Sequence, residues 1–257
     1  MSEPGQEGAF TVALTFTCDL AFFLPRAARA GATMEKQLRE KSSIKDVIES
    51  CGVPHTEVDL IGCDGRAVSF EHQLSSDAVV DVHGVLHRLT ERQPGLQTRT
   101  TTRFVADGHL GKLAREMRLL GLDVAYERDA TDHELAAVSS MQGRALLTRD
   151  RRLLMRRVVR DGYCLRSTDA AEQIIEVLRR YALAAALAPY TRCIQCNGLL
   201  VRVDKSAVLD QLEPLTREYY EEFRRCGSCG QIYWSGSHFA KLQERVEKLR
   251  AHFGTAD

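Results

Sequence analysis

The feature that most constrains the fold is an alternation of short apolar runs and amphipathic segments between residues 103 and 190. Two of the apolar runs end in an aspartate: Asp107 follows 104–106, and Asp150 comes soon after 145–148. Strands that alternate with helices need crossover connections, which predicts a parallel sheet with helices packed on it. A carboxylate at the C-terminal end of such a strand faces the crevice in which open α/β sheets bind their ligands.

The same segment predicts the individual elements. Apolar residues recur at helical spacing from Leu110 to Leu120, and Gly121 suits the end of that helix. Apolar runs predict strands at 104–106, 124–126, 145–148 and 163–165, and amphipathic spacing predicts helices at 110–120, 132–141, 153–159 and 169–187. We therefore expect an α/β domain over residues 103–190.

The N-terminal part predicts a small α+β domain over residues 8–90. Apolar and polar residues alternate from Phe10 onward, which is typical of a strand with one buried face. Ser43 is expected to cap a helix, and further strands are expected near 33–38, 58–61 and 78–82. The polar stretch 91–102, with Gln93-Pro94-Gly95 and a threonine-rich run, is expected to be a linker.

Charge is unevenly distributed, although the formal net charge is zero. Residues 1–98 hold 9 basic and 14 acidic side chains, 99–190 hold 16 and 12, and 191–257 hold 10 and 9. The basic excess beside the two aspartates suggests an anionic partner for the middle segment. No apolar run approaches ~18 residues and the N-terminus is polar, so we expect no membrane span or secretory signal and a cytoplasmic location.

Two Cys-x-x-Cys pairs mark the segment 191–257. They are Cys193 with Cys196 and Cys226 with Cys229, and 29 residues separate the pairs. Four thiolates with no open position predict a structural Zn²⁺ site. The gap exceeds the usual ~15–20 residues, which leaves room for a hairpin that begins near 199–203. Two redox pairs are the alternative, and the glycines close behind each pair favour zinc.

Acidic residues in the middle segment are candidates for a second metal site. Asp107 and Asp150 are the best pair for a hard divalent cation, which prefers oxygen ligands. Asp132 and Glu134 lie between them at a helix start, where the dipole favours ionised carboxylates. Structural roles stay open: Glu134 fits a capping box with Thr131, Asp132 fits a first-turn position, and the other two fit helix caps.

A set of basic residues flanks the two aspartates in sequence. Guanidinium groups bind phosphate in two-point geometry, so these side chains are candidates for contacts with nucleic acid. The candidates are Lys112, Arg115, Arg118, Arg149, Arg151 and Arg152. The alternative is that they form solvated helix faces.

Several motifs together resemble the Mut-seven C-terminal RNase family, a branch of the PIN-like nucleases. The middle of the chain resembles it through residues 104–115, 119–123 and 144–150. The cysteine pairs with residues 233–238 are similar to the zinc ribbon that follows this domain in the family. Residues 10–86 resemble its ubiquitin-like N-terminal companion, which is related in fold to sulfur-carrier proteins.

The resemblance implies an α/β PIN-like parallel-sheet domain, preceded by a ubiquitin-like α+β domain and followed by a zinc ribbon. It implies a Mg²⁺- or Mn²⁺-dependent ribonuclease in which Asp107 is the first acid and Asp150 the acid after the third strand. Asp132 or Glu134 supplies the middle acid, and the sequence does not choose. Asp169 is a poor candidate for a fourth acid, so the number of catalytic metals stays open.

RNA is the implied partner, with tRNA or another structured RNA as the candidate substrate and the oligomeric state open. The alternative function is a non-catalytic RNA- or ribosome-binding zinc-ribbon protein. A third reading, a sulfur-transfer adaptor, rests on the N-terminal fold alone. That domain lacks the terminal Gly-Gly of sulfur carriers, and its chain continues, which favours a binding or positioning module.

Overall fold

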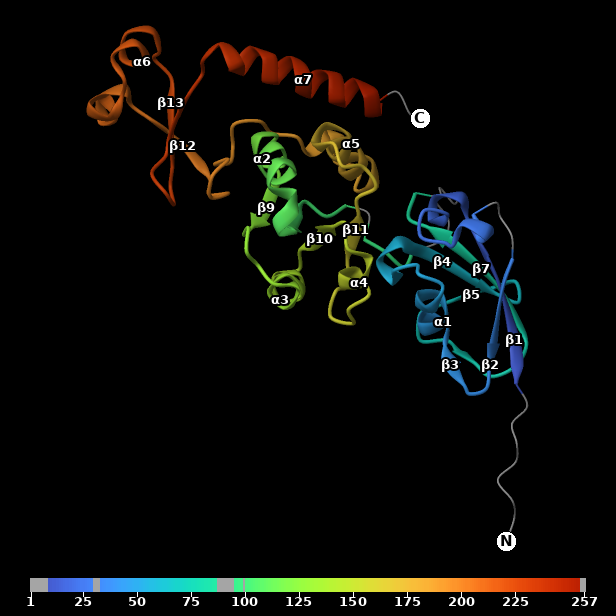
Figure 1. Cartoon of the computed structure of the whole chain (residues 1–257). Helices are drawn as coiled ribbons and strands as arrows, with labels where there is room; N and C mark the ends of the chain where they lie inside the picture. Colours follow the sequence, from blue (N-terminus) through green and yellow to red (C-terminus); the bar gives the residue numbers. More distant parts are fainter. Residues whose placement is uncertain (1–8, 30–32, 87–94, 99, 255–257) are drawn as a thin grey trace. The chain divides into compact units, whose positions relative to one another are not determined.

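The computed structural model describes residues 9–29, 33–86, 95–98 and 100–254 (Figure 1). The chain divides into two compact units. The first comprises Met1–Thr98 and Leu146–Arg166, and the second comprises Arg99–Ala145 and Ser167–Asp257. No helix in the described part of the chain is both long and apolar enough to span a bilayer.

A mixed sheet of order β2-β1-β7-β4-β5 dominates the N-terminal domain. The strands are β1 (Phe10–Phe16), β2 (Met34–Leu38), β4 (Val58–Cys63), β5 (Arg66–Val68) and β7 (Ala78–Gly84). The central strands β1 and β7 are parallel, and their neighbours pair antiparallel. β3 (Ser42–Ser43) and β6 (Gln73–Leu74) form a separate two-stranded sheet. This β-rich region agrees with the predicted ubiquitin-like domain.

Helix α1 (Ile44–Ser50) starts where the sequence predicts. The Ser43 hydroxyl accepts a hydrogen bond from the Asp46 backbone N–H at 3.1 Å, which satisfies one of the free donors of the first turn. Ile44, Val47 and Ile48 then fall on one face and are buried in the domain core. The strand that begins at Phe10 ends at Phe16, and a 3₁₀ turn at Cys18–Leu20 then carries Leu20 into the core.

A four-stranded sheet of order β11-β10-β8-β9 follows the alternation read from the sequence. Its strands are β8 (Arg103–Ala106), β9 (Asp123–Tyr126), β10 (Ala145–Thr148) and β11 (Gly162–Cys164). β8 and β9 pair in parallel, as do β10 and β11. The helices between and after them are α2 (Gly111–Leu119), α3 (Asp132–Gln142), α4 (Arg151–Leu154) and α5 (Ala170–Arg180).

Two of these helices are shorter than the sequence pattern predicts. Helix α4 stops at Leu154 because the chain then turns, with the Val159 N–H bonded to the Arg156 carbonyl and Val159 buried. Helix α5 stops at Arg180 because Ala182 has a φ of 52°, which an α-helix cannot accommodate. Apolar spacing continues past both ends, and for that reason the pattern alone overestimated their length.

The C-terminal segment forms a three-stranded antiparallel sheet of order β12-β13-β14. The strands are β12 (Leu200–Val203), β13 (Phe223–Cys226) and β14 (Ile232–Trp234), with α6 (Pro214–Tyr219) in the β12–β13 connection. The long helix α7 (Ser237–Gly254) follows, and Arg245 on it pairs with Glu116 of α2. The 3₁₀ turns are Cys18–Leu20, Arg26–Ala28, His55–Glu57, Gly108–Leu110, Ala184–Ala186, Lys205–Ala207 and Leu209–Gln211.

Within the first unit, residues 146–166 are bonded to the ubiquitin-like domain. Glu57, whose side chain is 0% exposed, pairs with the Arg166 guanidinium at 2.7 Å and accepts from the Cys164 backbone N–H at 2.6 Å. The Arg151 guanidinium donates to the Phe23 carbonyl at 3.1 Å. The segment that carries Asp150 is therefore held by a buried ion pair from the N-terminal domain.

Part of the predicted linker is also bonded to that domain. The Leu96 N–H donates to the Asp59 carbonyl at 2.7 Å, and the Gln97 N–H donates to the Asp59 carboxylate at 3.1 Å. Gln97 is buried by these contacts. Residues 91–94 and 99 of the predicted linker lie outside the described residues.

Candidate metal centre and nucleic-acid interface

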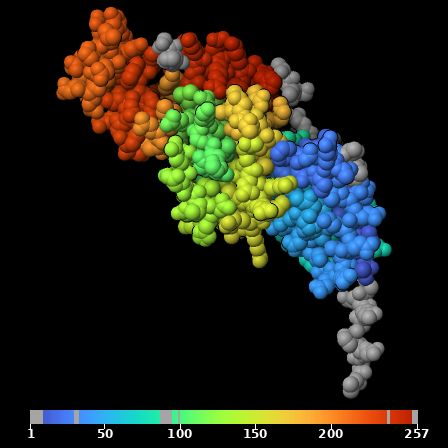
Figure 2. Space-filling view, viewed as in Figure 1, coloured from blue at the N-terminus to red at the C-terminus, as the bar shows by residue number. Residues whose placement is uncertain are grey.

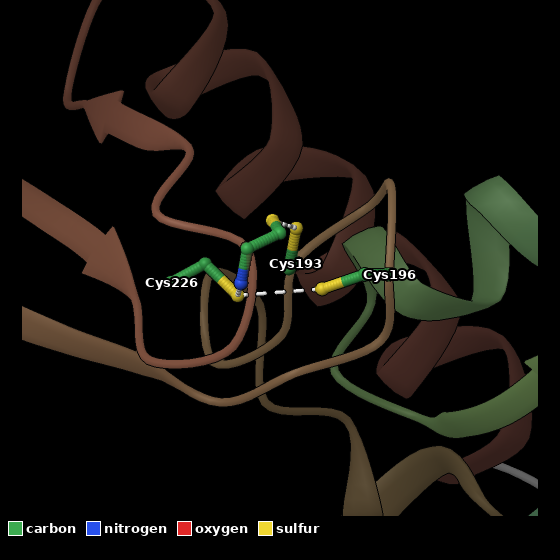
Figure 3. Close-up of side chains that lie close together, drawn as sticks. Cys193, Cys196 and Cys226 are labelled. Atoms are coloured by element: carbon green, nitrogen blue, oxygen red, sulfur yellow. Dashed lines mark hydrogen bonds between the residues drawn. The ribbon is translucent and has the colours of Figure 1, made fainter.

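The four predicted cysteines come together in the second unit. The Sγ atoms of Cys193, Cys196, Cys226 and Cys229 all lie within 4.8 Å of one another. Figure 3 shows the labelled cysteines pointing toward a common centre, with a dashed line between Cys196 and Cys226. These two Sγ atoms are 3.4 Å apart, and those of Cys193 and Cys229 are 3.6 Å apart.

Each cysteine pair sits on a turn with the same backbone hydrogen bonds. The Asn197 N–H donates to the Cys193 carbonyl at 2.9 Å, and the Gly230 N–H donates to the Cys226 carbonyl at 3.1 Å. Asn197 and Gly230 both have positive φ, at 69° and 76°, which closes each turn. We call the turn at Cys193–Asn197 the first knuckle and that at Cys226–Gly230 the second knuckle. The repeated geometry presents two pairs of sulfurs to one point.

Gly198 is needed for close packing between the two knuckles and not for the turn conformation. The turn conformation falls on Asn197, which tolerates the left-handed region. A Cβ on Gly198 would lie 2.8 Å from the Cys226 Sγ and 2.6 Å from the Ser228 Oγ. Gly198 is therefore required because the first knuckle approaches the sulfurs of the second so closely.

The surroundings lower the pKa of two of the four thiols, those of Cys193 and Cys226. Burial by itself raises the pKa of the Cys226 thiol, but the N–H groups of Cys229 and Ser228 lower it to about 6. The Tyr233 Oη lies 3.1 Å from the Cys193 Sγ. Burial and that sulfur raise the pKa of Tyr233, so the phenol keeps its proton and donates to the sulfur. The motif 233–238 includes Tyr233, but the sequence does not reveal its contact with the Cys193 sulfur.

The donor set fits a tetrahedral Zn²⁺ ion. With Zn–S bonds of ~2.3 Å, the sulfurs of a tetrahedron are ~3.8 Å apart, close to the distances between these cysteines. Four cysteines leave no position for water or substrate, which suits a structural ion. The side chain of His238, the last residue of the motif 233–238, lies outside the described residues.

The acidic candidates each serve as helix caps or first-turn residues. The Asp107 carboxylate accepts from the His109 N–H at 3.3 Å, directly after β8. The Asp150 carboxylate accepts from the Arg152 N–H at 2.8 Å, two residues after β10. Asp107 belongs to the second unit and Asp150 to the first. Their meeting at one ion is therefore part of the proposal below.

The two middle candidates are now distinguished by their contacts. The Glu134 carboxylate accepts from the Thr131 N–H and hydroxyl, both at 2.8 Å, and completes the capping box expected for this helix. These bonds lower the pKa of Glu134. Asp132 is exposed in the first turn of α3. Among the described residues, the four cysteines are the one group of three or more metal-ligating side chains that converge.

The basic candidates divide into exposed and buried side chains. Five of the six are exposed: Lys112, Arg115, Arg149, Arg151 and Arg152. Arg118 differs, because its side chain is 4% exposed and its guanidinium donates to three backbone carbonyls. Those carbonyls belong to Val124, Ile194 and Gln195, at 3.0, 3.2 and 2.7 Å. Arg118 therefore holds the first knuckle against β9 through its hydrogen bonds.

Asn197 makes a second link between the knuckle and β9. Its Oδ1 accepts from the Val124 N–H at 3.0 Å, and its Nδ2 donates to the Asp123 carboxylate at 2.7 Å. Arg144 and Arg192 also contact Asp123, at 2.6 and 3.3 Å. These partners lower the pKa of Asp123 although burial opposes them. The sequence motif includes Asn197 but does not reveal that its partner is a strand 73 residues away.

Comparison with models of protein families gives two matches to the chain. The Mut7-C RNAse domain matches residues 102–246, and the Mut7-C ubiquitin domain matches residues 9–90. Neither a comparison with curated proteins nor one with solved structures gave a match. The RNAse match covers more than half of the chain and runs without a break from β8 through the cysteine knuckles into α7. With the ubiquitin match before it, this layout shows that the chain belongs to the Mut7-C RNAse family.

Proposed function

We propose that the protein is a ribonuclease of the PIN-like type that hydrolyses RNA phosphodiester bonds with Mg²⁺ or Mn²⁺. The observation that supports RNA cleavage as the reaction is membership of the Mut7-C RNAse family. The proposed acids are Asp107 and Asp150, each of which follows a strand of the four-stranded sheet.

The chain's own residues have defined tasks in this proposal. Capping bonds to the His109 and Arg152 N–H groups fix the rotamers of Asp107 and Asp150. Asp132 or Glu134 supplies the middle acid; Asp132 lies in the first turn of α3, and one carboxylate oxygen of Glu134 belongs to the capping box. A bound divalent cation would activate a water and neutralise charge on the leaving oxygen. The carboxylates hold that cation, and exposed cations such as Arg149 and Arg152 bind the flanking phosphates.

The cysteine site has a separate, structural task. We propose that the four thiolates hold one Zn²⁺ and that the three strands around them form a zinc ribbon. The Tyr233 phenol and the knuckle N–H groups would stabilise the thiolates. RNA is the proposed substrate, with a structured RNA such as tRNA as the candidate, and the cytoplasm is the proposed location.

A second candidate function is RNA or ribosome binding without catalysis. The observation that favours it is the difference between the two sets of side chains. Four cysteines come together at one point, whereas no three acidic side chains of the second unit do so among the described residues. A binder would show salt-sensitive affinity and no turnover with Mn²⁺.

The test is incubation of the zinc-loaded full chain with total RNA and Mn²⁺, followed by mapping of the product ends. The variant is Asp150→Asn, because asparagine caps a helix as well as aspartate and removes only the charge. Asp169→Asn is the matched control, since Asp169 also caps a helix through two backbone N–H groups. We expect cleavage by wild type and Asp169→Asn and none by Asp150→Asn. Equal cleavage by all three would refute the site, and no cleavage by wild type would favour the binder.

A further inference from the structure

A basic groove of about 620 Å³ lies in the second unit, between the start of α2 and the first knuckle. Its charged lining consists of Lys112, Arg115, Arg118 and Arg128, and no acidic side chain of the described residues lines it. The backbone at Ile194 and Gln195 forms the opposite side. Figure 2 shows the green surface that includes α2 against the orange surface of the cysteine segment.

Three of the cations are available to a ligand. Lys112, Arg115 and Arg128 are exposed, and the described part of the chain records no ion pair for any of them. The fourth, Arg118, donates hydrogen bonds to carbonyls of the first knuckle, and its positive charge still adds to the potential in the groove. Net positive potential without a protein counter-ion is typical of a site for an anion.

The walls of the groove are fixed by short contacts. The Tyr126 hydroxyl donates to the Gly108 carbonyl at 2.9 Å, which binds the end of β9 to the turn before α2. A Cβ on Gly108 would lie 2.1 Å from the Arg128 carbonyl oxygen, so glycine permits this approach. Arg118 joins the far wall to β9 through the Gln195 carbonyl. The cations are therefore presented by a rigid frame, which lowers the ordering cost of binding.

We propose that this basic groove binds the phosphate backbone of single-stranded RNA, with the first knuckle as one wall. The proposal deepens the ribonuclease proposal and rests on it for the choice of RNA as the anion. The volume is in the range of ~300–1,000 Å³ that is typical of pockets for small ligands, which suits one or two nucleotides. A single strand bends into a concave basic site, whereas a duplex presents its phosphates on a convex surface. Arg128 is a contact that the sequence motifs did not indicate.

The experiment measures fluorescence anisotropy of a labelled single-stranded RNA with the zinc-loaded full chain, without Mg²⁺ or Mn²⁺, at several salt concentrations. We expect Lys112→Ala and Arg128→Ala each to weaken binding about tenfold, because each removes a charged hydrogen bond. Each should also reduce the slope of log K against log salt by ~0.7, the value for one phosphate contact on a single strand. Arg39→Ala, an equal charge change at an exposed residue of the first unit, should change neither.

A gain-of-charge pair tests the knuckle wall. Gln195→Lys adds a cation to the lining of the groove. Ser228→Lys adds a cation at the equivalent position of the second knuckle, and the second knuckle does not line the groove. We expect tighter binding and a steeper salt slope for Gln195→Lys alone. Equal gains for both variants would overturn the assignment of the wall. Unchanged affinity in Lys112→Ala and Arg128→Ala would overturn the groove, and preference for a duplex of the same sequence would overturn the single-strand assignment.

Failure of the two proposals is distinguishable, because binding is measured without cleavage. RNA binding that depends on the groove, with no turnover in Mn²⁺, refutes the ribonuclease and leaves the groove standing. Turnover with unchanged affinity and KM in the groove variants refutes the groove and leaves the ribonuclease standing.

Discussion

The two proposed metal sites differ in how the chain assembles them. The cysteine site draws all its ligands from residues 193–229 of one unit, on two turns with the same hydrogen bonds. The acidic site draws Asp107 and Asp132 from the second unit and Asp150 from the first. Two local turns suffice to pre-arrange four sulfurs, whereas carboxylates at strand ends depend on the arrangement of a sheet. The first site is therefore a property of a short segment, and the second a property of the tertiary fold.

The largest expected effect is loss of the zinc ion in Cys226→Ser. Zinc binding to a four-cysteine site supplies on the order of 10 kcal/mol, and a serine hydroxyl does not replace a thiolate. Elemental analysis should give about one zinc per wild-type chain and close to none for the variant. Cys18→Ser is the control, since Cys18 is an exposed thiol outside the cluster. A zinc-free wild type that is fully folded would contradict the account.

The next largest effect separates the two sites. Glu57→Gln removes the buried partner of Arg166 and should destabilise the first unit by about 3–5 kcal/mol, because it leaves a buried charge unpaired. Residues 146–166, and with them Asp150, should lose support, so RNA cleavage should fall while zinc content stays at one per chain. Urea unfolding and elemental analysis measure both. The exposed Glu40→Gln should alter neither, and loss of zinc in Glu57→Gln would show that the two sites are not independent.

Tyr233→Phe should weaken the zinc site without abolishing it. Removal of a partner that donates to a metal ligand typically costs ~10–100-fold in metal affinity. We expect a loss near the lower limit, because backbone N–H groups still bond the sulfurs of the second knuckle. Competition with a chelator of known affinity measures it, with Tyr219→Phe on the exposed face of α6 as the control. Equal affinity in the two variants would remove Tyr233 from the site.

The smallest expected effect is a change in acid stability in Asp123→Asn. The pKa of Asp123 is lowered in the folded chain, so its ion pairs stabilise the fold at neutral pH. That contribution is present above the unfolded pKa and is lost as pH falls through the lowered pKa, below about pH 4. The variant should melt ~2–4 °C below wild type at pH 7, and the difference should shrink as acid protonates the Asp123 carboxylate. Asp210→Asn is the exposed control, and a difference that persists into acid would contradict the assignment.

Sequence reasoning succeeded where the physical signal is local. Ser43 was predicted to cap a helix and Thr131 to take part in a capping box, and each makes the expected hydrogen bonds. The four cysteines converge because each pair is fixed by its own turn. The apolar runs of the middle segment gave its strands within a residue or two, because buried strands of a parallel sheet are continuously apolar.

Sequence reasoning failed where a partner is distant in the chain. Arg118 has the spacing of a solvent-exposed position beside the apolar stripe of α2, but two of its three carbonyl partners lie 76 and 77 residues away. Arg128 in the basic groove belongs to no motif, and it is identified only by the lining of the groove. Helix α5 ends at Arg180 although its apolar spacing continues, because Ala182 adopts a left-handed conformation.

The most direct test of the central claim is a count of bound Mn²⁺ by electron paramagnetic resonance in the zinc-loaded full chain. The account predicts that Asp107→Asn and Asp150→Asn each abolish the same binding event, and that the double variant loses no more than either single variant. This result follows because both carboxylates would ligate one ion. Unchanged Mn²⁺ binding in either variant, or the loss of two separate ions, would contradict the account.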